Sequence, residues 1–127
     1  MSVCTFLASD YLLPEVDYFL YSFRDVRDYT DKSYGIYLEW DCTDEEANML
    51  LKYIKEGLKK DKSIELWHVW LGDYYEYEDS PVIHKKVRTI KELTIQEIQE
   101  LACAEIFNHP DKYIPSRPSF YCLKITR

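Results

Sequence analysis

One cysteine and one histidine are the residues whose types could support nucleophilic catalysis. Cys42 directly precedes an expected helix, and the backbone amides at a helix start favour a thiolate. His68 lies in an apolar run and could serve as the base for this nucleophile if the two chain segments approach each other. The acidic residues around Cys42 disfavour a thiolate, and no local signature of a cysteine enzyme is present. Cys42 and His68 are therefore weak candidates for catalysis, and a buried thiol and a hydrogen-bonded core histidine are the alternative interpretation.

An acidic stretch rich in tyrosine is the most distinctive surface feature that the sequence predicts. Its candidate partner-binding residues are Asp73, Tyr74, Tyr75, Glu76, Tyr77, Glu78 and Asp79. Tyrosine offers rigid contact area, and the carboxylates are complementary to a basic protein. The alternative is that this stretch is only the solvated end of a hairpin.

The other motifs that carry chemistry are missing from the sequence. Four cysteines are scattered without short Cys/His pairs, at Cys4, Cys42, Cys103 and Cys122. A structural zinc site usually draws on two such pairs, so we expect no metal, and we predict thiols that are free and mostly buried. Because no glycine-rich loop follows a strand and no serine nucleophile elbow is present, we also expect no cofactor.

Composition limits the kind of protein that this chain can be. It has 127 residues, 46% of them hydrophobic, and this predicts one α+β domain over residues 1–127. Its net charge of −7 without a basic cluster argues against direct binding of nucleic acid. The sequence has neither an apolar run of membrane-spanning length nor a signal peptide at its start. We therefore expect a cytoplasmic protein with no membrane contact.

The elements that must position these residues are arranged around the apolar run Ile64–Leu71. Alternate residues of a strand face opposite sides, and both sides of this run are mostly apolar. Such a strand is expected inside a sheet, with a cover on each face. Residues 11–34 are rich in aromatic side chains, and we expect them to form an irregular segment that packs on another part of the protein. Further strands are predicted at Val3–Ala8, Gly35–Trp40, Val82–Ile90 and Phe120–Ile125.

Two capping boxes mark the starts of two helices. Thr43 and Glu46 begin a helix over about residues 43–60. Thr94 and Glu97 begin a second helix that extends through about Phe107. In both segments the apolar residues recur at helical spacing, so each helix is expected to place one face on the core.

The connections between the elements define the expected fold. The simplest connection is a long hairpin, in which Ile64–Glu78 pairs with Val82–Ile90 and Tyr75 lies opposite His84. Strand-helix-strand-strand-helix-strand is the order of a ferredoxin-like sandwich, but that topology places its third strand in the middle of the sheet. The basic residues of Val82–Ile90 are instead typical of an edge strand. We expect an α+β fold with a mixed or antiparallel sheet of about five strands and two helices on one face, and a ferredoxin-like variant is one alternative.

These features support three functional hypotheses. The leading one is a non-catalytic module that binds a basic protein partner through the acidic, tyrosine-rich hairpin. The second is a small-molecule-binding protein or enzyme with a pocket between the sheet and residues 11–34, in which tyrosine, His68 or Cys42 acts. The third is a homodimer in which a second subunit covers one face of Ile64–Leu71. The second face of Ile64–Leu71 could be covered by residues 11–34, by a second subunit or by a ligand, and which of these covers it would distinguish the three hypotheses.

Overall fold

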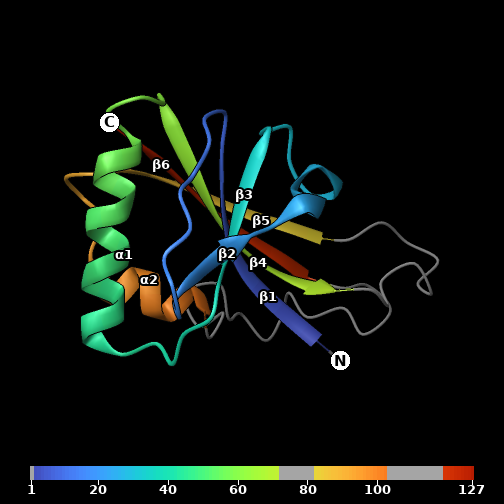
Figure 1. Cartoon of the computed structure of the whole chain (residues 1–127), viewed down its shortest axis with the longest axis horizontal. Coiled ribbons are helices and arrows are strands. Elements are labelled where there is room, and N and C mark those ends of the chain that lie inside the picture. The colour runs from blue at the N-terminus through green and yellow to red at the C-terminus, as the bar shows by residue number, and fades with distance from the viewer. Residues whose placement is uncertain (1, 72–81, 103–118) are drawn as a thin grey trace.

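The structure is a computed structural model of the whole chain and describes residues 2–71, 82–102 and 119–127. In these ranges six strands form one mixed sheet (Figure 1). In chain order the strands are β1 (Ser2–Ser9), β2 (Leu20–Ser22), β3 (Tyr34–Leu38), β4 (Ser63–Leu71), β5 (Val82–Thr89) and β6 (Ser119–Thr126). Their order across the sheet is β2-β3-β1-β4-β6-β5. The α+β fold and the mixed sheet are as predicted, and the sixth strand is the three-residue β2.

The apolar strand β4 lies inside the sheet, as its two apolar sides predict. It pairs antiparallel with β1 from Ser2–Leu71 to Ala8–Glu65, and antiparallel with β6 on its other edge. Neighbouring strands therefore satisfy the hydrogen-bonding groups on both edges of β4. The side chains on its two faces enter two different clusters, one beneath the helices and one beneath the aromatic segment.

Helix α1 (Asp44–Gly57) begins at the predicted capping box. The Thr43 hydroxyl accepts from the Glu46 amide at 3.2 Å, and the Glu46 carboxylate accepts from the Thr43 amide at 3.3 Å. Two amides that the first helical turn would leave without a partner are thereby satisfied. One face of the helix is apolar, and its residues Ala47, Leu50 and Ile54 are fully buried.

Helix α2 (Ile95–Ala102) has only one half of the predicted capping box. The Thr94 hydroxyl accepts from the Glu97 amide at 3.2 Å. The Glu97 carboxylate instead accepts from the Arg88 guanidinium at 2.9 Å, which joins the helix to the edge strand β5. Residues 103–107, to which the predicted helix extends, lie outside the described part of the chain.

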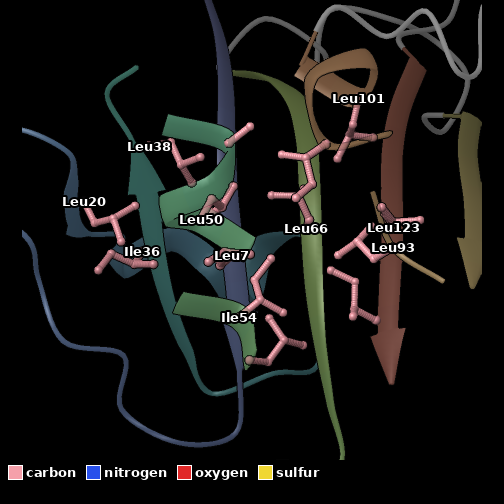
Figure 2. Packing of buried hydrophobic residues seen from close by; sticks show 14 of the residues in the cluster. Leu7, Leu20, Ile36, Leu38, Leu50, Ile54, Leu66, Leu93, Leu101 and Leu123 are labelled. Carbon is pink, nitrogen blue, oxygen red and sulfur yellow. The ribbon is translucent and has the colours of Figure 1, made fainter. Parts of the chain in front are cut away.

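Both helices pack on the same face of the sheet, as predicted (Figures 1 and 2). The cluster between the helices and the sheet joins side chains of five strands to apolar residues of both helices. Figure 2 shows Leu7, Ile36, Leu66 and Leu123 of the sheet beside Leu50 and Ile54 of α1 and Leu101 of α2. Burial of this apolar area is the main stabilising contribution that the helices make.

The second face of the sheet is covered by the aromatic segment around a 3-10 helix, η1 (Arg24–Asp28). Phe6 of β1 lies 4.7 Å from Phe23, 5.5 Å from Tyr29 and 6.1 Å from Trp67, measured between ring centroids. The segment approaches β3 so closely that a Cβ atom on Gly35 would lie 2.8 Å from the Val26 Cβ. Residues 11–34 therefore supply a cover for the second face of β4, one of the three possibilities that the sequence left open.

The predicted hairpin is wrong. Strand β5 pairs in parallel with β6 over its full length, from Val82–Ser119 to Thr89–Thr126, and β6 separates it from β4. The physical reason is that β6 is apolar on both faces and takes the inner position, whereas the basic β5 lies at the edge, as its composition predicts. The third strand of the strand-helix series thus lies at an edge, and β1 is inserted between β3 and β4, so the order differs from a strict ferredoxin-like sheet.

Candidate functional site

A cleft opens where β1 and β3 stop pairing. Their ladder runs from Ser9–Tyr34 to Phe6–Tyr37, and beyond it a cavity of about 710 Å³ lies between the two chain segments. We call this cavity the acidic-aromatic cleft. Its lining includes the aromatic residues Tyr18, Tyr37 and Trp40, the carboxylates Glu39, Asp41 and Glu46, and the polar residues Cys4, Thr5, Cys42 and His68. The predicted strand Gly35–Trp40 ends earlier, at Leu38, because the chain turns here toward α1.

Two residues of the cleft have left-handed backbones. Tyr18 has φ 64° and Cys42 has φ 59°, and no other non-glycine residue in the described ranges has a positive φ. Such conformations are uncommon for residues with a bulky side chain and need support from their surroundings. The Tyr18 amide donates to the Tyr21 hydroxyl at 3.1 Å, and the Gln99 side chain of α2 donates to the Cys42 carbonyl at 2.9 Å. Both turns at the cleft are therefore held in place by specific hydrogen bonds.

Two tyrosines, Tyr18 and Tyr37, line the cleft. Tyr21 and Tyr37 are cross-strand neighbours on β2 and β3, and their rings stack with centroids 5.5 Å apart. Tyr18, on the turn before β2, is 91% exposed. A large side chain on a braced turn is a favourable contact for a partner, because little of its backbone freedom remains to be lost on binding.

The cleft has negative charge and no compensating cation in its lining. None of the residues that line it is a lysine or an arginine. The Glu46 carboxylate is occupied by the start of α1, where it accepts from the amides of Asp41 and Thr43. Glu39 and Asp41 are exposed, and neither forms an ion pair with another described residue. These two carboxylates are available to a cationic ligand.

His68 belongs to the cleft as a neutral, hydrogen-bonded group. Its Nδ1 atom lies 2.9 Å from the Thr5 hydroxyl, and burial lowers the pKa of the imidazole below its usual value. The ring therefore adds no positive charge at neutral pH. Burial also raises the pKa of the neighbouring Cys4 thiol to about 11, so this thiol stays protonated.

The two residues that the sequence singled out for catalysis, Cys42 and His68, line the same cleft. The hydrogen-bond partner of the His68 Nδ1 atom is the hydroxyl of Thr5, a residue that the sequence did not single out. The proposed partner-binding residues Asp73, Tyr74, Tyr75, Glu76, Tyr77, Glu78 and Asp79 fall within 72–81, outside the described residues. Among the described residues, no three His, Cys, Asp or Glu side chains are placed to hold a metal ion.

Most of the cleft was not predicted from the sequence. The alternation of Tyr37 and Glu39 along their strand places the two side chains on one side, and this was the signal that could have indicated an acidic and aromatic surface. The contribution of Tyr18 depends on a left-handed backbone, for which a tyrosine gives no sequence signal.

Comparison of the chain with protein-family models, curated proteins and solved structures found no match. In the described part of the chain, no helix is long and apolar enough to cross a membrane. The function therefore has to be inferred from the residues of the cleft themselves.

Proposed function

We propose that this protein binds a basic segment of another protein in the acidic-aromatic cleft and acts through this binding without catalysis. The observation that carries the proposal is a cavity of about 710 Å³ that combines three aromatic side chains and three carboxylates with no lysine or arginine. Lysine and arginine side chains of a partner are attracted both by the carboxylates and by the faces of aromatic rings. The net charge of −7 extends this attraction to longer range.

The individual residues have distinct roles in this proposal. Tyr18 is the exposed aromatic anchor, of the residue type that is enriched where truncation weakens protein complexes most. Glu39 and Asp41 supply the charge that selects a cation. The neutral His68 leaves that negative potential uncompensated at neutral pH. The acidic, tyrosine-rich residues Asp73–Asp79 have the same chemistry, and we propose them as a second contact for the same partner.

The proposal is tested by affinity capture from a lysate of the native host on the immobilised protein. We expect a basic protein to be retained and to be released by added salt, since exposed charge pairs are screened. A Glu39→Gln/Asp41→Asn variant should weaken this binding roughly two- to thirtyfold, the range that two exposed ion pairs give. Tyr18→Asn removes the aromatic anchor and keeps a residue type that tolerates the left-handed backbone.

The matched control is Glu56→Gln/Glu100→Gln, which removes two carboxylates that do not line the cleft. Capture by this variant should equal that of the unmodified protein. Retention of the same proteins at the same level by the two cleft variants would refute the proposal, and so would retention of acidic proteins only.

A small-molecule-binding protein or enzyme is a second candidate, because Cys42 and His68 line one cavity with Tyr18 of the segment 11–34. In that case Cys42 would act as a nucleophile, and its alkylation at neutral pH would be faster than that of a free thiol. A rate equal to or below that of a free thiol removes the catalytic alternative. The homodimer hypothesis loses its main support, because a single chain covers both faces of Ile64–Leu71, and a monomer in light scattering at micromolar concentration would exclude a stable dimer.

A further inference from the structure

A second cavity, of about 620 Å³, lies on the face of the sheet that carries the aromatic segment. Residues 27–32 form one side of it, and the side chains of Glu65, Trp67, Ile83 and Lys85 on β4 and β5 form the other. We call it the Glu65 cavity. It shares no lining residue with the acidic-aromatic cleft, so a ligand bound here would be independent of the proposed function.

The central group of this cavity is a buried carboxylate. Glu65 is only 7% exposed, and its Oε1 atom accepts from the Thr30 hydroxyl and from the Trp67 indole, the latter at 2.9 Å. The Oε2 atom lies 3.9 Å from the Lys85 ammonium, which is too long for a hydrogen bond. Among the described residues no other group donates to Oε2. Because no fully buried side-chain polar atom of the described residues lacks a hydrogen-bond partner, Oε2 is open to the cavity, where it can accept from water or from a ligand.

Lys85 supplies a donor beside this acceptor. Its side chain is 47% exposed and is within reach of the same space as the Glu65 Oε2 atom. A gap of this length between two polar groups is commonly bridged by a water or a ligand atom. Glu65 and Lys85 thus present an acceptor and a donor side by side to whatever enters the cavity.

Charges of both signs surround the pair, and this limits the kind of ligand. The lining has four carboxylates and three cationic groups. One of the cations, Lys32, is occupied by the Asp10 carboxylate at 3.2 Å and the Ser63 carbonyl at 3.0 Å. An anion would meet the fixed Glu65 carboxylate, and a cation would meet the Lys85 ammonium. A neutral ligand is therefore favoured over a charged one.

We propose that the Glu65 cavity binds a neutral ligand through an amide edge, in which an N–H donor lies next to a C=O acceptor. The ligand N–H would donate to the Glu65 Oε2 atom, and the ligand C=O would accept from the Lys85 ammonium. Two adjacent ligand atoms suit the 3.9 Å spacing better than one oxygen does, because each hydrogen bond can remain close to linear. The Tyr29 ring and the Ile83 side chain, which also line the cavity, give apolar contacts for a planar group of this kind.

The Trp67 indole N–H is a direct reporter, because it donates to the same carboxylate. Its signal in a ¹H–¹⁵N spectrum is identified with a Trp67→Phe variant and is then followed as millimolar uridine, glutamine or glucose is added. Uridine has an imide edge and glutamine a carboxamide, so the response to each distinguishes a nucleobase-like source from an amino-acid source. 3-Methyluridine keeps the ring and lacks the N–H donor.

We expect the Trp67 signal to shift with uridine, with glutamine or with both, and not with 3-methyluridine. Lys85→Met should weaken the binding at least about tenfold, since it removes a charged hydrogen bond. Lys86→Met is the matched control, because successive side chains of a strand face opposite sides, and it should leave the affinity unchanged. Glu65→Gln should weaken binding similarly, and the Lys85 variant decides the matter if the Glu65 variant does not fold.

Three results would overturn the proposal. The Trp67 signal could stay in place with both amide probes, or shift equally with 3-methyluridine, or respond to glucose alone. The second result would indicate ring contact without the amide edge, and the third would indicate a hydroxyl ligand. Equal affinities of the Lys85→Met variant and the unmodified protein would also overturn it.

Discussion

The Thr5 hydroxyl of β1 and the Nδ1 atom of His68 of β4 are hydrogen-bonded at 2.9 Å between directly paired strands. The pair joins the central strand of the sheet to the acidic-aromatic cleft, which both residues line. Burial keeps the imidazole neutral by lowering its pKa. Protonation of His68 would therefore change both the stability of the sheet and the charge of the cleft.

We predict that the free energy of unfolding falls with acid because of His68. The folded pKa lies below the usual value of about 6.5, so the unfolded chain binds a proton first. The stabilisation is present above the unfolded pKa and is lost as the pH falls through the lowered folded pKa. Urea unfolding at about pH 7.5 and about pH 5 measures the change. A His68→Gln variant should lose less stability between the two values than the unmodified protein.

The control for this prediction is His84→Gln on the edge strand β5. His84 stacks on Tyr121 with ring centroids 5.0 Å apart and does not line the cleft. This variant also removes an imidazole, but one outside the cleft, so acid sensitivity that falls further in the His68 variant than in this one is assigned to His68. An equal loss of stability in the His68 variant and in the unmodified protein would show that another group causes the acid sensitivity.

The start of α1 gives a second prediction. Thr43→Ala removes the hydroxyl that accepts from the Glu46 amide at 3.2 Å, and this should lower the free energy of unfolding by about 1 kcal/mol. Thr43→Ser keeps the hydroxyl and should change stability far less. Urea denaturation of both variants checks this. Equal destabilisation by serine and alanine would indicate that the methyl group of Thr43, and not its hydroxyl, is responsible.

The contact between η1 and β3 gives a third prediction. Gly35→Ala places a Cβ atom 2.8 Å from the Val26 Cβ and should destabilise the protein by about 1–3 kcal/mol through overpacking. The Val26→Ala variant leaves that Cβ atom in place and removes the Cγ2 atom, which would lie 2.9 Å away. In a double-mutant cycle, the two changes together should cost less than the sum of the single changes. Strict additivity would show that the approach of the two segments relaxes without cost.

The parts of the fold that sequence could predict are those with local signals. The capping box from Thr43 to Glu46 is a four-residue motif that predicts the start of α1, and the structure confirms this start. The two apolar sides of Ile64–Leu71 indicate an inner strand that is covered on both faces, and this too is confirmed. Both signals are strong because no distant part of the chain is needed to interpret them.

Strand pairing could not be predicted in the same way, because it depends on competition between distant segments. The hairpin hypothesis paired Val82–Ile90 with the strand that precedes it in the chain. In the structure β4 pairs instead with β6, which comes from the end of the sequence. Leu123 and Ile125 of β6 are fully buried against the helices, and Phe120 and Cys122 are buried on the opposite face. The cleft was missed for a related reason, since it unites Thr5, Tyr18 and Glu39 from three separate segments.

Cysteine reactivity gives the last prediction. Burial raises the pKa of Cys4 to about 11 and that of Cys122 to about 12, where the nearby Glu65 carboxylate adds to the effect. At neutral pH both thiols should therefore react with iodoacetamide more than about tenfold slower in the folded protein than in urea, because only the thiolate is nucleophilic. Peptide mapping by mass spectrometry at several reaction times measures each cysteine separately, and the urea sample is the internal control. Labelling of Cys4 or Cys122 at similar rates in the folded and unfolded protein would contradict the burial of that thiol, and for Cys4 it would also contradict the protonated state assigned to the cleft.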